Sequence, residues 1–326
     1  MSVGESAELV LKIEDLYTSF HTQGVAVKAV DGISLDIRSS EVFGLVGESG
    51  SGKSVTALSI MRLISPPGMI EGGRIIFKGR DLLELSESEM REVRGDKISM
   101  IFQDPAAFLN PIMRVGKQIA EPLTLHRGMN RSQARKRVLE LMDLVGIPDP
   151  EQRIDDYPHQ LSGGMRQRVL IATALACQPD ILIADEPTTA LDVTIQAQIL
   201  DLLRDLQSTF GSSVVLITHD LGVIAEMCHR VAVMYAGQVM EVADTEALLN
   251  NPQHPYTAAL LESLPQLGRR KERLRVIPGS VPSAVTPPSG CRFHPRCSRA
   301  EEICRIEVPP LIRLANGRQA ACHRCA

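Results

Sequence analysis

The chain has 326 residues, a hydrophobic fraction of 44% and a formal net charge of −4. This composition supplies a large core, and the mild acidity argues against a nucleic-acid-binding protein that works by bulk electrostatics. The absence of Trp and an aromatic content of only 3% argue against a platform for stacked bases. The acidic N-terminal residues argue against an export signal, and no apolar run reaches the roughly 18 residues of a membrane helix. We therefore expect a cytosolic chain, or one docked on a membrane from the cytosolic side.

The hydrophobic pattern predicts an α/β fold in which strands alternate with helices. Residues 8–40 alternate apolar and polar side chains between glycine turns, which predicts strands at Leu9–Ile13, Lys28–Val30 and Ser34–Ile37. Short β-branched runs predict buried parallel strands at 42–46, 181–185 and 214–218. The remaining periodic segments predict helices, at about 53–63, in the charged part of 64–100, at 114–145 and at 165–177.

The character of the chain changes past about residue 265, where Pro and Gly become dense and regular periodicity fades. Five of the seven cysteines lie in the last 36 residues, whereas Cys177 and Cys228 lie singly in apolar segments typical of buried thiols. In a cytosolic chain such a cysteine cluster is more often a metal site than a set of disulfides. We expect a main domain over 1–264 and a small extension over 265–326, held by something other than a large core.

A phosphate-binding loop follows the predicted strand at 42–46 and opens a helix. Its eight residues match the pattern G-x-x-x-x-G-K-[ST], and they are Gly47, Glu48, Ser49, Gly50, Ser51, Gly52, Lys53 and Ser54. Glycines let backbone N–H groups curl around phosphates, and the helix N-terminus adds positive partial charge. Lys53 is expected to reach the β- and γ-phosphates of a nucleotide, and Ser54 to ligate Mg²⁺.

A second anion-binding segment reads Leu161-Ser162-Gly163-Gly164-Met165-Arg166-Gln167-Arg168. Ser162, Gly163 and Gly164 at a helix start offer a hydroxyl and free N–H groups. One nucleotide cannot occupy both segments of one chain, because they are over 100 residues apart on different helices.

With this segment the chain resembles the ATP-binding-cassette (ABC) family, whose signature it is, over about residues 8–262. The resemblance implies a P-loop NTPase fold with a mostly parallel core sheet, an antiparallel β subdomain and a helical subdomain at about 104–175. It also implies a head-to-tail dimer, in which each ATP lies between one chain's phosphate loop and the partner's Ser162, Gly163 and Gly164.

The same resemblance assigns the catalytic residues. Asp185, at the end of the strand at 181–185, is expected to hold Mg²⁺ through water, and Glu186 to orient and deprotonate the attacking water. His219 resembles the switch histidine that contacts the γ-phosphate. Gln103, in the sequence IFQDP, resembles the loop glutamine that senses Mg²⁺ and the water.

Two further assignments complete the nucleotide site. Ala190-Leu191-Asp192 resembles the loop that crosses the dimer interface, so Asp192 is expected to act on the partner's nucleotide. Phe20 lies where the family places an aromatic that stacks on adenine, and Tyr17 is the alternative.

The terminal cysteines resemble the extension of the dipeptide/oligopeptide/nickel importer ATPases. The match rests on His254-Pro255-Tyr256-Thr257, the run CRFHPRC, and cysteines separated by five, six and seventeen residues, at Cys291, Cys297, Cys304 and Cys322. The resemblance implies a [4Fe–4S] cluster on these four thiolates, whose chemistry suits a cubane. Zinc is the alternative, because Cys322-x-x-Cys325 has zinc spacing and His294 and His323 are near in sequence. Reduced, unliganded thiols are the third possibility.

The function implied is that of an ATP-hydrolysing subunit of a membrane importer for di- or oligopeptides. The expected partners are a second ABC ATPase, two membrane permease subunits and an external solute-binding protein, without nucleic acid. The chain would lie peripherally on the cytoplasmic face of the inner membrane and contact the permease through residues 104–125. The resemblance favours a heterodimer of cassettes over a homodimer. Nickel or another small solute as the cargo, a soluble non-transport cassette and an export cassette remain alternatives.

Overall fold

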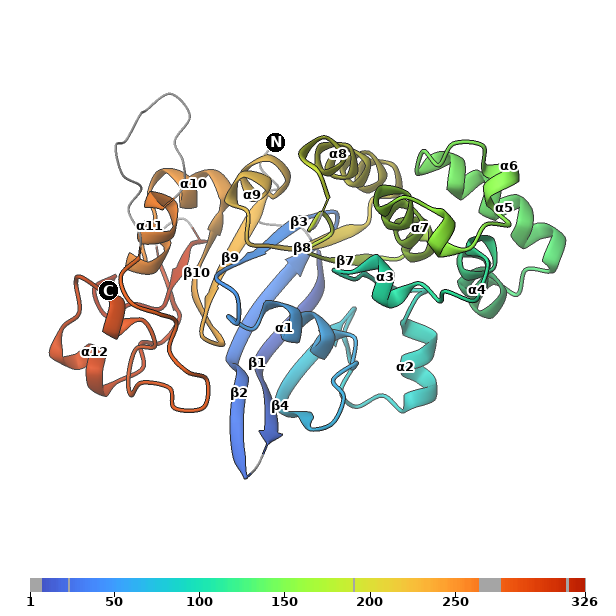
Figure 1. Ribbon diagram of the computed structural model, residues 1–326. Helices are drawn as coiled ribbons and strands as arrows, with labels where there is room; N and C mark the ends of the chain where they lie inside the picture. Colours follow the sequence, from blue (N-terminus) through green and yellow to red (C-terminus); the bar gives the residue numbers. More distant parts are fainter. Residues whose placement is uncertain (1–7, 23, 190, 264–276, 315–316, 326) are drawn as a thin grey trace.

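The computed structural model describes residues 8–22, 24–189, 191–263, 277–314 and 317–325. At its centre lies a mixed sheet of eight described strands (Figure 1). In sheet order they are β11 (Ile312–Arg313), β12 (Gln319–Ala320), β10 (Gln238–Asp244), β9 (Arg230–Tyr235), β3 (Val42–Val46), β8 (Ser213–Thr218), β7 (Ile181–Asp185) and β6 (Ile98–Ile101). The strands from β9 to β6 pair in parallel, whereas β10, β12 and β11 add antiparallel pairs at one edge.

The three predicted parallel strands are confirmed. β3, β7 and β8 are buried along their whole lengths, and β8 pairs with β3 on one side and β7 on the other. Continuous apolar runs suit this position, because helices and a second sheet cover both faces. The carboxyl ends of these strands therefore meet at one edge, where the phosphate loop begins.

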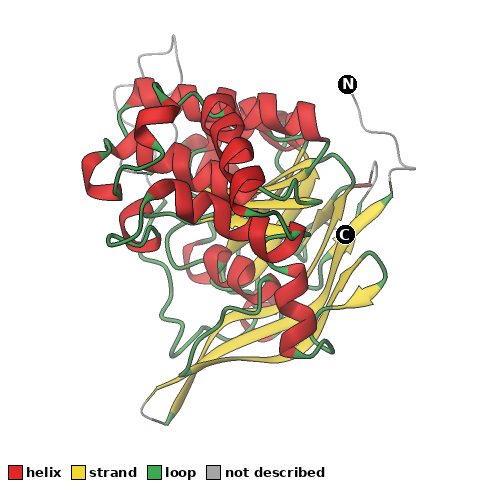
Figure 2. Ribbon diagram, turned by 90° about the vertical axis from the view of Figure 1, so that its right-hand side faces the viewer, coloured by secondary structure: helices red, strands yellow, loops and turns green. Residues whose placement is uncertain are grey.

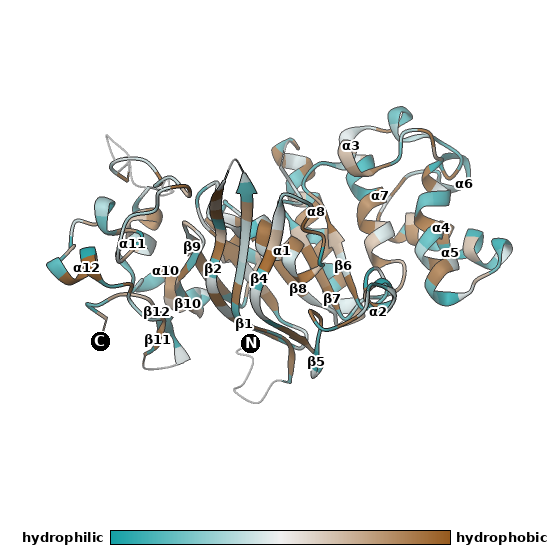
Figure 3. Ribbon diagram, turned by 90° about the horizontal axis from the view of Figure 1, so that it is seen from below, coloured by the Kyte–Doolittle hydropathy of each residue, from teal (hydrophilic) through white to brown (hydrophobic). Residues whose placement is uncertain are grey.

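A second, antiparallel sheet packs beneath the first. Its strands, in sheet order, are β2 (Val25–Arg38), β1 (Leu9–Thr22), β4 (Gly68–Phe77) and β5 (Arg80–Asp81). Helix α1 (Lys53–Ile60) contributes Ile60 to the shared cluster, together with Leu11 of β1 and Leu45 of β3. Seen from below, the apolar residues gather along the strands in the middle of the molecule (Figure 3).

The prediction of several short strands over residues 8–40 is wrong in its boundaries. β1 and β2 are each 14 residues long, and together they form the long hairpin at the lower left of Figure 2. The pairing shifts register between Ile13 and Leu16, and Asp15 has a φ of 44°. Such a bulge breaks the alternation of side chains without ending the strand, so the pattern looked like separate strands.

The helical part lies at one end of the molecule (Figure 1). Its elements are α3 (Pro105–Phe108), α4 (Val115–Arg127), α5 (Arg131–Leu144), α6 (Pro150–Arg153), the 3₁₀ turn η1 (Pro158–Gln160) and α7 (Gly163–Leu175). The periodic segment 114–145 is thus two helices, because Gly128 ends α4 with a φ of 60° and Asn130 caps α5. The remaining helices of the cassette are α2 (Glu87–Val93), α8 (Val193–Phe210), α9 (Leu221–Met227), α10 (Thr245–Asn250) and α11 (Pro255–Glu262). In the described ranges, none combines the length and apolar character needed to cross a bilayer.

The C-terminal segment lies at the opposite end, beside β10 (Figure 1). It contains the 3₁₀ turn η2 (His294–Arg296), α12 (Glu302–Ile306), β11 and β12. β12 pairs with β10 through Ala320 and Glu241, and Phe293 belongs to the main hydrophobic cluster. The expectation of a segment held without the large core is therefore wrong for these residues. The predicted boundary near residue 264 falls at 264–276, outside the described residues.

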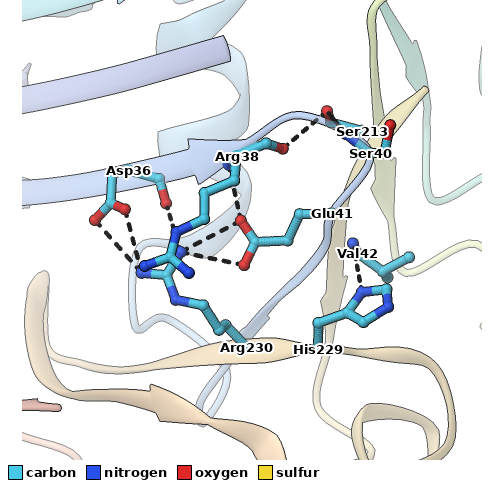
Figure 4. A network of polar contacts seen from close by, with 8 residues as sticks. All are labelled: Asp36, Arg38, Ser40, Glu41, Val42, Ser213, His229 and Arg230. Carbon is cyan, nitrogen blue, oxygen red and sulfur yellow. Dashed lines mark hydrogen bonds and ion pairs between the residues drawn. The ribbon is translucent and has the colours of Figure 1, made fainter. Parts of the chain in front are cut away.

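A buried ion-pair network fixes the point where the antiparallel sheet leads into β3 (Figure 4). The Glu41 side chain is 1% exposed; it accepts a hydrogen bond from the Arg38 backbone N–H at 2.8 Å and from Arg230 Nη1 at 3.1 Å. Arg230 also donates to the carboxylate of Asp36 at 3.3 Å. The buried carboxylate is thus fully compensated, which holds the start of β3 in place.

Candidate active site

The phosphate loop leaves β3 at Gly47 and ends at Gly52, the N-cap of α1. A Cβ at Gly47 would overlap the carbonyl oxygen of Met234, and a Cβ at Gly52 would overlap that of Ala29. Gly52 also has a φ of 101°, which favours glycine. The neighbouring backbone of β9 and β2 therefore leaves room only for glycine at both ends of the loop. This requirement holds whether or not phosphate is bound.

Lys53 lies inside the curl of the loop. Its Nζ donates to the carbonyl oxygens of Gly47 at 2.8 Å and Glu48 at 3.1 Å. Burial lowers the pKa of Lys53, and the nearby Glu186 and Asp185 oppose this shift. The loop backbone thus holds the Lys53 ammonium in place. A phosphate group bound in the loop would contact both this positive charge and the backbone N–H groups of the loop.

Ser54 and Asp185 supply oxygen ligands beside the loop. Ser54 Oγ donates to Asp185 Oδ1 at 3.1 Å, and Asp185 is 5% exposed at the end of β7. Burial raises the pKa of Asp185, although the hydrogen bond from Ser54 opposes the shift. A hydroxyl and a carboxylate at this separation fit the hard oxygen ligands that Mg²⁺ prefers, with Asp185 acting directly or through water.

Glu186 is the centre of a polar cluster. Its carboxylate accepts hydrogen bonds from Gln103 Nε2 at 3.0 Å and Thr189 Oγ1 at 2.8 Å, and its Oε1 lies 3.2 Å from His219 Nδ1. Burial alone would raise the pKa of Glu186, but the hydrogen bonds from Thr189 and His219 outweigh it, so the net pKa lies below its usual value. The carboxylate is therefore charged at neutral pH, as a general base must be.

The backbone of Glu186 is strained, with a φ of 45°. Its N–H donates to the Ile217 carbonyl of β8 at 2.9 Å, which holds the residue in this conformation. Non-glycine residues in the left-handed region are uncommon and gather at functional sites. In this conformation the Glu186 side chain lines the same cavity as the phosphate loop.

The phosphate loop and the Glu186 carboxylate line one cavity of about 500 Å³. The predicted residues that line it are Ser49, Gly50, Ser51, Gly52, Lys53, Ser54, Gln103, Glu186 and His219. Chemically, the cavity offers a cradle for phosphates at one side and a charged base with two further polar groups at the other. A larger cavity of about 670 Å³ lies elsewhere, between β1, β2 and the C-terminal segment.

The second anion-binding segment lies outside this cavity. Ser162 is the N-cap of α7, where its Oγ accepts from Met165 N–H at 3.3 Å, and Ser162 and Gly163 are exposed. Asp192 is the exposed N-cap of α8 and accepts from Ile195 N–H at 3.0 Å. Ala190 of the predicted interface loop lies outside the described residues. The structure therefore does not bring Ser162, Gly163, Gly164 or Asp192 to the cavity of the same chain.

The two candidate adenine-stacking residues also lie away from the lining of the cavity. Phe20 is partly buried near the end of β1, and its ring lies against Gly68. Tyr17 is 37% exposed, lies against Gly32 and lines the larger cavity. Phe20 and Tyr17 thus contact different neighbours, and neither residue lines the cavity that contains Lys53.

The C-terminal thiols meet at one small cavity of about 20 Å³. Four of its lining residues are Cys291, Cys297, Cys304 and Cys322, and His254, His294 and His323 also line it. Burial raises the pKa of Cys291 to about 11. Cys325 does not line the cavity; its Sγ donates to the Gln253 carbonyl at 3.3 Å. Among the described residues, no group of three or more His, Cys, Asp or Glu side chains has an arrangement that could hold a metal ion.

Sequence reasoning missed three residues around the loop. Thr189 lies three residues after Glu186, and its hydroxyl is the only feature of the sequence that could have indicated a hydrogen bond to the Glu186 carboxylate. Tyr256 and Arg296 lie within the two C-terminal motifs, but both contact Glu48, which is over 200 residues away. No local pattern predicts such a contact.

Comparison with known proteins identifies two family models. Residues 30–189 match the model described as "ABC transporter", and residues 240–304 match "Oligopeptide/dipeptide transporter, C-terminal region". A probable peptide ABC transporter ATP-binding protein of Sinorhizobium fredii is 52% identical, over 99% of this chain and 97% of that protein. The dipeptide transport ATP-binding protein DppD of Escherichia coli is 52% identical, over 96% of each chain.

Solved structures give the same fold. The dimeric post-hydrolysis state of the ATP-binding cassette MJ0796, bound to ADP and Pi, has a TM-score of 0.66 at 30% identity and covers 72% of this chain and 98% of that one. CbiO1 from Clostridium perfringens, part of an ABC transporter complex, has a TM-score of 0.63 at 28% identity. The match covers 75% of this chain and 92% of that one. The predicted ABC-type α/β fold is confirmed over the part of the chain that these structures cover.

Proposed function

This chain belongs to the ABC transporter ATP-binding proteins that carry an oligopeptide/dipeptide C-terminal region, and on that premise we propose that it powers the uptake of short peptides across the cytoplasmic membrane. The observation that carries the ATPase chemistry is the Glu186 carboxylate at the same cavity as Lys53. The relatives are peptide and dipeptide transport proteins, which supports a short peptide as the cargo.

The residues of the cavity take separate parts in hydrolysis. The loop from Gly47 to Ser54 wraps the phosphates, and Lys53, anchored on the carbonyls of Gly47 and Glu48, directs its charge at the β- and γ-phosphates. Ser54 and Asp185 would hold Mg²⁺, which neutralises charge on the phosphates and orients them. Glu186 deprotonates the attacking water after its bonds to Gln103 and His219 open to admit it. His219 and Gln103 then contact the γ-phosphate and the water.

Two cassettes complete each site. Ser162, Gly163, Gly164 and Asp192 present polar groups at the N-termini of α7 and α8, but they lie outside the cavity of their own chain. These groups would bind the nucleotide of a second ABC ATPase, and the partner would be a related chain in a heterodimer. ATP joins the two cassettes, and its hydrolysis separates them.

The remaining partners follow from transport. Residues 104–125 carry exposed apolar side chains at Phe108 and Ile112, which are 52% and 85% exposed. This surface follows Gln103 directly, so it would transmit movement of the nucleotide site to two permease subunits. The chain would then lie on the cytoplasmic face of the membrane, and an external binding protein would deliver the peptide. Copurification of the full complex from membranes, with its subunits identified by mass spectrometry, tests this arrangement.

We propose a metal centre at Cys291, Cys297, Cys304 and Cys322, with a [4Fe–4S] cluster as the first candidate and zinc as the alternative. The four thiols line one cavity, and thiolates are ligands for both metals, but these side chains would have to move from the positions described here to hold either one. Anaerobic purification with iron, sulfide and zinc analysis decides between them, and zinc without iron excludes the cluster.

The decisive test of the ATPase assignment is Glu186→Gln in the assembled transporter. Turnover should fall by about 10²- to 10⁴-fold, because the amide cannot accept the proton of the attacking water. ATP binding should persist, and the ATP-bound dimer should accumulate. Glu302→Gln, at an exposed carboxylate of α12, is the matched control and should retain full turnover. Undiminished turnover in Glu186→Gln would remove Glu186 as the base.

A further inference from the structure

Two residues of the C-terminal motifs reach the phosphate loop. Arg296, from the run CRFHPRC, and Tyr256, from His254-Pro255-Tyr256-Thr257, both contact Glu48, the second residue of the loop. The proposed hydrolysis uses neither residue. In Figure 1 the C-terminal segment lies beside β10, and β9 lies between β10 and β3, the strand that leads into the loop.

Arg296 binds the side chain of Glu48. Its Nη1 donates to Glu48 Oε2 at 2.7 Å and its Nη2 donates to Oε1 at 3.2 Å, in a bidentate pair. The Arg296 side chain is 6% exposed and that of Glu48 27%. Arg296 Nε also donates to the Pro278 carbonyl at 2.9 Å, and Nη1 donates to Tyr235 Oη at 3.2 Å. The guanidinium is thus fixed by the C-terminal segment and by β9 before it meets the loop.

Tyr256 holds the backbone of the same residue. Its Oη accepts from the Glu48 N–H at 3.1 Å, and the tyrosine is fully buried. Its ring packs against Tyr235 and Phe293, with centroids 4.6 and 5.3 Å away. This aromatic cluster joins α11, β9 and the cysteine-rich segment, so the position of the hydroxyl depends on all three.

We propose that Glu48, Tyr256 and Arg296 form a loop latch, through which the C-terminal segment sets the affinity of the phosphate loop for ATP. Lys53 Nζ is anchored on the carbonyls of Gly47 and Glu48, so a shift of this turn displaces the ammonium that meets the phosphates. Holding Glu48 at its N–H and its carboxylate keeps the turn in one conformation. A preformed loop binds ATP more tightly because the loop loses less conformational entropy when the nucleotide binds. Arg296 and Tyr256 are therefore positioning residues, not catalytic ones.

The test is a double-mutant cycle on ATP affinity in the full chain. Glu48→Gln, Arg296→Met and the double variant are made in a Glu186→Gln background, so that hydrolysis does not consume the ligand. The dissociation constant for MgATP is measured by calorimetry. Each single variant should raise it about tenfold, the order expected when a charged hydrogen bond is lost. The double variant should equal either single one, because both remove the same contact. The measurement depends on ATP binding alone, and not on the proposed cargo or partners.

Controls separate the latch from general stability. Arg305→Ala removes an exposed guanidinium from α12 of the same segment and should leave ATP affinity unchanged. Arg296→Lys keeps the charge without the bidentate fork and should give an intermediate affinity. If Arg296→Met does not fold, Glu48→Gln and Arg296→Lys decide the question. A lowered thermal midpoint with unchanged affinity, or effects that multiply in the double variant, overturns the proposal.

Discussion

The ion-pair network at the start of β3 gives a quantitative prediction. Glu41→Ala removes a carboxylate that is 1% exposed and leaves Arg230, itself 11% exposed, with Asp36 as its remaining carboxylate in the network. Removing one partner of a buried ion pair costs about 3 to 5 kcal/mol, because the other charge stays buried. Since Arg230 keeps one carboxylate, we expect the lower end, about 3 kcal/mol.

Asp36→Ala is the matched variant, because Asp36 contacts the same arginine from a side chain that is 31% exposed. Its loss should cost about 1 kcal/mol in the free energy of unfolding, because Asp36 is partly exposed and solvent screens its charge. Urea unfolding should be followed by far-UV circular dichroism, because the chain has no Trp for fluorescence. The urea concentrations at half-unfolding should differ clearly between the two variants, while the dependence of the unfolding free energy on urea concentration stays similar. An equal loss of unfolding free energy in Glu41→Ala and Asp36→Ala would refute the argument that the burial of the carboxylate determines how much its removal destabilises the fold.

Three further predictions concern the nucleotide site and a buried thiol. Gly52→Ala should weaken ATP binding at least tenfold, because the new Cβ overlaps the Ala29 carbonyl; calorimetry checks this, and normal binding would mean that the loop tolerates the overlap. Lys53→Ala should abolish measurable ATP binding in the same assay, and unchanged affinity would mean that the loop is wrongly assigned. Cys228 is 9% exposed and burial raises its pKa, so iodoacetamide should modify it only after unfolding. Mass spectrometry of the native chain at neutral pH checks the last point, and native labelling would contradict it.

The sequence predicted the core of the site because its residues lie in short contiguous motifs. Lys53 and Ser54 follow the glycines of the loop directly, and Asp185 and Glu186 end a buried strand. The parallel arrangement of β3, β7 and β8 then brings these strand ends together. Fold and site were predictable to this extent because local pattern and strand order determine them.

Other features depend on contacts that no local pattern carries. The long hairpin of β1 and β2 was read as separate strands because the bulge near Asp15 interrupts the alternation. Phe20 has the expected position in sequence, yet its ring contacts Gly68, since the packing of β4 decides where the side chain lies. Arg296 and Glu48 are 248 residues apart, and only the tertiary fold brings them together.

The short strand β12 covers part of the edge of β10. It pairs with β10 at Glu241 and Val242, on the side of β10 that β9 leaves open. A chain shortened to residues 1–264 would present that part of β10 as an unpaired edge, which other chains can extend by strand addition. A chain that ends before β12 would therefore expose this part of β10, even though it keeps all the motifs for ATP.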